Sequence, residues 1–238
     1  MKKSIIATCA VILVSASPAT ALQFDIFNST DDSNINSWIS ARGGQVSVLE
    51  DFEDLNAGWY TSLDSGVGTF TAGGQPGGGA TSYNANNNPN SSDPYFSIQS
   101  RSEPWFGRYN TTTGGEKWLD SGDITKLILT DIDESLTNLF FYLQDPSDVN
   151  ATTTITATGQ TTSFSESFND EGNGNSFFIG ITLDENEFLS ALSWETTTNG
   201  DGYGLDDFST VAPVPEPATM LLFGTGLAGL ASIRRRKK

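Results

Sequence analysis

The sequence predicts an all-β domain, an antiparallel β-sandwich of the jelly-roll type with a short N-terminal helix. Three observations indicate this fold class. From Gln45 onward, short runs of alternating or aromatic-rich residues recur, Gly, Asn, Asp, Ser and Thr separate these runs, and no long helical period appears. The 24 glycines suit the many turns that such strands need. Two sheets packed about 10 Å apart would bury their inner faces.

The individual elements follow from the pattern in chain order. A helix is expected over 33–41, with Asp32 or Ser33 as its N-terminal cap, Trp38 and Ile39 on its apolar face, and Gly43-Gly44 at its end. The predicted strands are 46–52, 68–72, 95–99, 126–130, 139–143, 153–157, 162–165, 177–183, 189–194 and 205–211. The expected core consists of Val46, Val48, Phe52, Phe70, Leu127, Leu129, Phe140, Tyr142, Phe178, Ile181, Leu192, Trp194 and Phe208.

A long loop is expected over residues 73–94. This stretch contains three consecutive glycines and three consecutive asparagines and offers little to bury. It is an insertion or a rim of a functional site, and we favour the insertion.

Residues 1–21 have the order of parts of a secretory signal peptide. Lys2 and Lys3 form a positive start, residues 5–14 are apolar, and Ala19-Thr20-Ala21 is a small-residue cleavage site. The acidic sandwich domain is therefore expected to span residues 22–212. Cys9, the only cysteine, falls in the apolar stretch, so the mature domain lacks disulfides and cysteine-based sites.

The charge balance restricts the possible functions. The chain has 12 Lys+Arg, 29 Asp+Glu and a net charge of −17, and it contains no histidine. Such a surface repels nucleic acid, and it either attracts cations or simply keeps an exported protein soluble. Without histidine there is no Ser-His-Asp triad and no His-ligated metal. We therefore expect a protein that is not an enzyme and has no catalytic residues.

The C-terminal segment, residues 213–238, has three parts in a fixed order. Three prolines in 213–217 form a stiff linker, residues 218–233 carry no charge, and residues 234–238 are all basic. As a helix the apolar run is about 24 Å long, somewhat short of the about 30 Å hydrocarbon core. Snorkelling arginines or local thinning would allow it to act as a transmembrane helix. The positive-inside rule places the basic tail on the cytoplasmic side.

This order of parts resembles the PEP-CTERM sorting signal of exopolysaccharide-associated bacterial proteins. The matching residues are Val214, Pro215, Glu216, Pro217, Arg234, Arg235 and Arg236. The resemblance implies processing by an exosortase, with Glu216 as a recognition element. It also implies transient retention in the inner membrane of a Gram-negative-type bacterium. The implied destination is the cell surface or the extracellular matrix.

Two acidic-aromatic segments, 37–56 and 201–208, resemble the opening and closing strands of carbohydrate-binding jelly rolls. In those modules the two strands lie side by side and their carboxylates hold a structural calcium. The resemblance implies a Ca²⁺ site at Asp51, Glu53, Asp206 and Asp207. Calcium prefers six to eight oxygen ligands, and alternation would place Asp51 and Glu53 on one strand face. The alternative interpretation is a solvated acidic edge that discourages aggregation.

Aromatic side chains in predicted loops are the candidate contacts for a sugar, because an exposed ring can stack on a sugar face. They are Trp59, Tyr60, Trp105, Tyr109 and Trp118. Packing over the ends of the sandwich is the alternative. Taken with the resemblance to PEP-CTERM proteins, the sequence leads us to expect a non-enzymatic surface or matrix protein associated with exopolysaccharide and biofilm. The second hypothesis is a calcium-stabilised carbohydrate-binding module that recognises extracellular polysaccharide.

Overall fold

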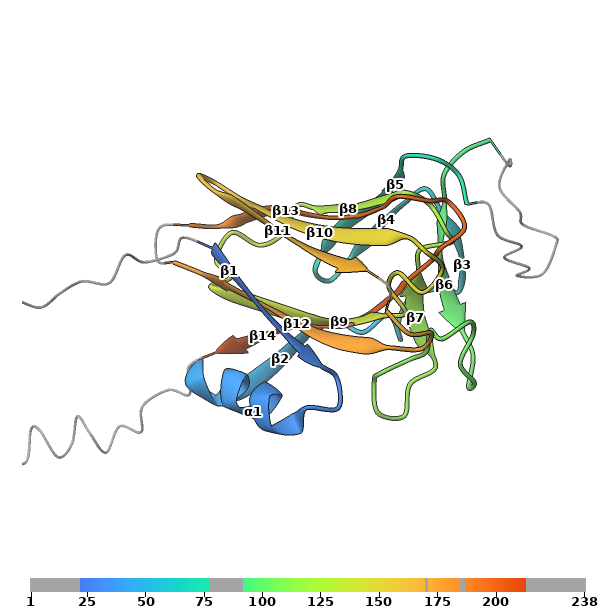
Figure 1. Ribbon diagram of the computed structural model, residues 1–238. Helices are drawn as coiled ribbons and strands as arrows, with labels where there is room; N and C mark the ends of the chain where they lie inside the picture. The colour runs from blue at the N-terminus through green and yellow to red at the C-terminus, as the bar shows by residue number, and fades with distance from the viewer. Residues whose placement is uncertain (1–21, 78–91, 170, 185–186, 213–238) are drawn as a thin grey trace, which may run out of the picture.

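The computed structural model describes residues 22–77, 92–169, 171–184 and 187–212, and these residues form a two-layered antiparallel β-sandwich (Figure 1). The first sheet has the order β1-β12-β9-β14-β7-β6-β3, with β2 paired to β14 outside this path. The second sheet has the order β11-β10-β13-β8-β5-β4. The predicted fold class is confirmed. The predicted signal peptide 1–21, the sorting segment 213–238 with its apolar run 218–233, and most of the predicted loop lie outside the described residues.

The strands of the first sheet are β1 Leu22–Asn28, β2 Gln45–Glu50, β3 Gly58–Tyr60, β6 Phe96–Ser100, β7 Lys117–Asp120, β9 Asn138–Gln144, β12 Ser176–Leu183 and β14 Gly204–Ala212. Those of the second sheet are β4 Ser62–Ser65, β5 Gly68–Gly73, β8 Lys126–Thr130, β10 Thr152–Gly159, β11 Ser163–Asn169 and β13 Leu189–Thr196. All ten predicted strands are therefore present. The sequence pattern missed β1, β3, β4 and β7, of which three have only three or four residues.

The main core lies between the two sheets and is rich in aromatic rings. Phe141 and Phe208 stack with their centroids 4.8 Å apart, and Phe70 and Trp194 from the second sheet pack against them. All four side chains are fully buried. Ring pairs of this kind add to the stabilisation that burial itself provides.

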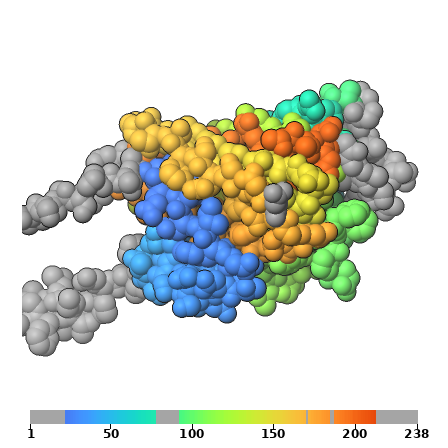
Figure 2. Space-filling view, in the orientation of Figure 1, coloured from blue at the N-terminus to red at the C-terminus, as the bar shows by residue number. Residues whose placement is uncertain are grey.

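A second apolar cluster forms where α1, Asp32–Ala41, packs on the outer face of the first sheet. The cap is Asp31 and not Asp32 or Ser33 as predicted, because the Asp31 side chain accepts from the Asn34 backbone N–H at 3.2 Å. Trp38 contacts Phe140 and Phe178 edge-to-face. Figure 2 shows the blue residues of β1 and α1 as one continuous surface on this side of the molecule. Both faces of β9 are consequently buried.

The core prediction is wrong at two positions and imprecise at three. Val46 and Val48 are 43% and 56% exposed, because β2 pairs with β14 outside the main path of the sheet and no described layer covers these side chains. Phe140 and Phe178 belong to the cluster under the helix, and Tyr142 packs against it half-buried. The alternation identified side chains that share a face, but it did not reveal which face another layer covers.

Candidate functional site

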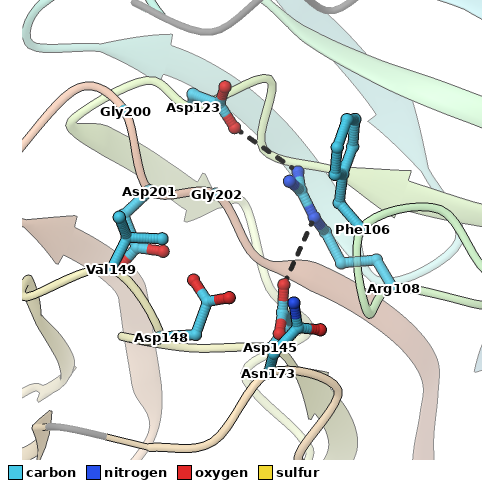
Figure 3. A pocket seen from close by; sticks show the side chains of 10 residues that line it. All are labelled: Phe106, Arg108, Asp123, Asp145, Asp148, Val149, Asn173, Gly200, Asp201 and Gly202. Atoms are coloured by element: carbon cyan, nitrogen blue, oxygen red, sulfur yellow. Dashed lines mark hydrogen bonds and ion pairs between the residues drawn. The ribbon is translucent and has the colours of Figure 1, made fainter.

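An acidic cavity of about 220 Å³ opens among the loops at one end of the sandwich (Figure 3). Its walls come from the segments that follow β6, β7, β9, β11 and β13. Its lining residues are Phe106, Arg108, Asp123, Asp145, Asp148, Val149, Asn173, Gly200, Asp201 and Gly202. Sequence reasoning had not assigned a site to any of them.

The loops around this pocket hold an unusual share of left-handed backbone. Asp123, Asp145 and Asn150 have φ values of 58°, 55° and 53°, which Asp and Asn tolerate better than other side chains. Phe106 has a φ of 48°, a conformation that costs an aromatic residue about 1–3 kcal/mol. Backbone strain of this kind clusters at functional sites, where the surrounding structure holds it in place.

Two glycines allow the loops to close around Arg108. A Cβ atom at Gly107 would lie 2.6 Å from the carboxyl carbon of Asp145. A Cβ atom at Gly202 would overlap the side chains of Asp123 and Arg108. The pocket therefore requires the absence of a side chain at both positions.

Arg108 is the central cation of the pocket and is only 5% exposed. Its Nη1 lies 3.0 Å from both carboxylate oxygens of Asp120. Its Nη1 also lies 3.5 Å from Asp123, and its Nε lies 3.9 Å from Asp145 (Figure 3). Burial alone would lower the pKa of Arg108, but these carboxylates raise it above the ordinary value. The guanidinium thus neutralises one of several nearby negative charges.

The charge of Arg108 lowers the pKa values of the other carboxyls, but it does not cancel the effect of their burial. Burial raises the pKa of Asp145 to about 6, although its Oδ1 accepts from the Gly174 N–H at 2.6 Å. Burial and the neighbouring Asp148 raise the pKa of Asp201 to about 7. Burial likewise raises the pKa of Asp123. Perturbed carboxyl groups that share a cleft are a physical mark of a functional site.

Asp201 is the most unusual residue of the cavity. The residue is 2% exposed, and apart from a proton that it can share with the carboxyl of Asp148, its carboxylate oxygens have no hydrogen-bond donor among the described residues. Buried polar atoms are almost always paired, so an orphaned carboxylate indicates a missing proton or ligand. Asp148 is half-buried and faces Asp201 in Figure 3. At the mouth, Phe106 and Val149 are 62% and 55% exposed.

The four residues of the predicted calcium site divide between two hydrogen-bond networks. Asp51 and Glu53 do not lie on a strand face, because β2 ends at Glu50 and Phe52 turns the chain with a φ of 61°. Glu53 Oε1 accepts from the Asn110 side chain and from the backbone N–H groups of Glu116 and Lys117, each at 2.8 Å. These three donors already surround Glu53 Oε1, an oxygen that would have to bind the predicted calcium ion.

Asp206 and Asp207 meet at Thr111 instead. The Thr111 hydroxyl lies 2.9 Å from Asp206 and 2.8 Å from Asp207. Burial, followed by the charge of Asp207, raises the pKa of Asp206 well above its ordinary value. The opening and closing strands β2 and β14 do lie side by side, as expected. Within the described part of the chain, no group of three or more His, Cys, Asp or Glu residues is arranged to hold a metal. Calcium binding remains a prediction.

The predicted sugar-contacting aromatics differ in their accessibility. The prediction that Trp118 lies in a loop is wrong. Trp118 belongs to β7 and is fully buried. It cannot stack on a ligand because the sandwich covers its ring.

The other four rings remain half-buried. Trp59 lies edge-to-face on Tyr95, Tyr60 stacks on Phe96, and the Tyr109 backbone N–H donates to Gln144. Trp105 lies beside the pocket: its ring carries the Arg101 guanidinium at 3.8 Å and contacts Phe106 edge-to-face. Among the predicted aromatic residues, Trp105 is therefore the one that directly precedes Phe106 at the cavity mouth.

The C-terminal segment supplies the match to known proteins. A family model described as the PEP-CTERM protein-sorting motif matches residues 213–237. The chain carries a PEP-CTERM sorting signal. The predicted motif, Val214 to Pro217 with the basic residues from Arg234, is thereby confirmed. The PEP-CTERM signal marks an exported protein that passes through a membrane-anchored intermediate and is processed by exosortase.

The PEP-CTERM match covers the tail and none of the sandwich. No curated protein matches the chain. In the stretches of chain that the structure describes, no helix has the length and apolarity needed to cross a membrane. The apolar run of the PEP-CTERM signal lies outside those stretches, so its role as a transmembrane helix stays a prediction.

Proposed function

We propose that this PEP-CTERM protein is a non-enzymatic component of the cell surface or extracellular matrix, associated with exopolysaccharide in the biofilm of a Gram-negative-type bacterium. The observation that carries the proposal is the sorting motif at residues 213–237. Two features of the body support it. An acidic composition keeps a matrix protein soluble during export, and a chain without histidine lacks the commonest general acid–base residue.

Fractionation of the producing cells tests this role. In cells with exosortase, a shortened form without the C-terminal tail should collect in the matrix fraction. In cells without exosortase, the full-length form should stay with the membrane. A variant that lacks residues 234–238 serves as a control, because it should lose the orientation that the basic tail imposes. Recovery of the mature protein free in the medium, with none in the matrix, would contradict a matrix role.

Recognition of extracellular polysaccharide is the second candidate function. It is favoured by the aromatic pair Trp105 and Phe106 beside the pocket, because Phe106 is 62% exposed. A glycan array with the mature protein should show selective binding that Trp105→Ala removes. Phe164→Ala is the matched control, since this ring is 38% exposed and belongs to β11. Melting with and without a chelator tests the calcium that the sequence predicted, and an unchanged midpoint would remove calcium from this function.

A further inference from the structure

We propose that the acidic pocket binds a primary ammonium group, carried on a small amine such as an amino sugar, between Asp148 and Asp201. The argument for binding at the pocket uses only the contacts of its residues. Its biological meaning rests on the proposed extracellular role, in which the amine would belong to a matrix component.

The charge of the pocket is the first argument. Five carboxylates, those of Asp120, Asp123, Asp145, Asp148 and Asp201, act on one another or on Arg108. Among the residues that line the cavity, Arg108 is the single basic one. Its shortest contacts go to Asp120, which leaves the Asp148 side of the cavity with excess negative charge. Buried charges of one sign persist only where a counter-charge or a proton neutralises them.

The orphaned carboxylate of Asp201 is the second argument. Apart from a proton shared with the facing carboxyl of Asp148, its two oxygens have no donor among the described residues. A single proton shared by the two carboxyls would form only one hydrogen bond between them and would leave their other oxygen atoms without a donor. An ammonium group carries three N–H donors and a positive charge, so it can donate to both carboxylates at once. The ligand therefore replaces a proton with a better-matched cation.

The shape of the cavity is the third argument. About 220 Å³ is roughly seven times the volume of about 30 Å³ that one water occupies in the liquid, so the cavity admits more than a bare ion. Phe106 and Val149 give its mouth an apolar surface. A ligand with a cationic end and an apolar or sugar-ring body would contact both parts. The ring of Phe106 adds attraction for a cation that passes it.

A metal ion uses less of this architecture. Calcium prefers six to eight oxygen ligands, whereas the described acidic residues do not converge as a group of three. The exposed Phe106 and Val149 would also have no role around a metal ion. The amine explains both the carboxylate pair and the apolar mouth.

NMR titration of the isotope-labelled mature protein tests the proposal. The probes are glucosamine hydrochloride and glucose, which differ at one position, together with pentylammonium chloride and calcium chloride. Glucosamine should shift the pocket resonances, whereas glucose should not. Binding of pentylammonium without glucosamine would support the ammonium site and identify an alkyl amine as its source. Equal binding of glucose and glucosamine would overturn the proposal, as would tighter, Asp201-dependent binding of calcium.

Three substitutions make the test specific. Asp201→Asn should weaken binding of glucosamine by about tenfold or more, because it removes a charged hydrogen-bond acceptor. It should keep or raise the melting temperature, because it also removes an unpaired buried charge. Asp148→Asn provides a second variant at a half-buried position in case Asp201→Asn fails to fold. Asp54→Asn makes the same chemical change at an exposed carboxyl and should leave binding unchanged.

Binding should also weaken as the pH falls through about 7, where Asp201 takes up a proton. The charged groups that face Asp201 are Asp148, Asp145 and Arg108, and the two carboxylates hold its proton more tightly. Unchanged glucosamine affinity in both Asn variants would refute the assignment of the site. Such a failure would leave the fractionation test of the matrix role unaffected.

Discussion

Replacing Arg108 by methionine removes the one basic side chain that lines the acidic pocket and keeps most of its aliphatic stem. The guanidinium is 5% exposed and lies within 3.0–3.9 Å of oxygens from Asp120, Asp123 and Asp145. Loss of one partner from a buried ionic network costs about 3–5 kcal/mol. Since three carboxylates lose their counter-charge, we expect about 4–5 kcal/mol.

Thermal unfolding followed by circular dichroism measures this effect. For a domain of this size each kcal/mol shifts Tm by about 2–4 °C, so Arg108→Met should lower Tm by about 8–20 °C. Lys126→Met is the matched control, because it removes a cation from the exposed pair with Glu195, whose atoms lie 2.7 Å apart. An exposed pair contributes at most about 1 kcal/mol, which corresponds to about 2–4 °C.

The pH dependence of the stability lost in Arg108→Met distinguishes the loss of a charge from the loss of packing. Without the guanidinium, the folded-state pKa values of Asp123 and Asp145 rise further above their unfolded values. The folded variant then binds protons that the unfolded chain does not, so acidification from pH 7 towards 4 should shrink the deficit. A deficit equal to that of Lys126→Met, or one that does not change with pH, would refute the electrostatic account of this pocket.

Two further predictions concern the carboxyls of Asp145 and Asp201 and the packing of α1 on the first sheet. The pKa values of Asp145 and Asp201, raised to about 6 and about 7, should make their contribution to stability fall as the pH rises from about 4 through 7. Urea unfolding at pH 5 and pH 8 checks this fall, and an Asp201→Asn variant with the wild-type slope would contradict it. Gly180→Ala should cost about 1–3 kcal/mol, because the new methyl group would lie 2.6 Å from Trp38. Gly200→Ala, with open space around it, should stay within about 0.5 kcal/mol in the same denaturation assay, and an equal loss in both variants would contradict the clash.

The sheet architecture was predictable because its signals are local. Two-residue alternation and turn residues located ten strands, and the pair Gly43-Gly44, with φ values of 116° and 80°, marked the end of α1. Burial in β2 was not predictable, since Val46 and Val48 alternate correctly but no second layer covers them. The sequence pattern does not show which strands form an open edge.

The candidate site was hardly predictable, because its residues are brought together by tertiary structure alone. Arg108, Asp145 and Asp201 come from three loops that are distant in the sequence. In the sequence, Asp201-Gly202 has only the composition of a turn. The turn at Phe52 and the donors of the loop around Thr111 could not be predicted from the acidic segments. These hydrogen bonds depend on side-chain positions across the domain, which composition and spacing do not encode.

The pocket lies far from the C-terminal end of the described chain. Asp201 lies just before the start of β14, and the described chain ends at Ala212, where β14 ends. An extended strand of this length covers about 25 Å, so the pocket and the attachment point of the tail lie at opposite ends of the sandwich (Figure 1). In the membrane-anchored intermediate the pocket would therefore open away from the point of attachment. Buried carboxylates destabilise a fold relative to apolar residues of the same size, so this arrangement is better explained by a ligand from outside the membrane than by stability.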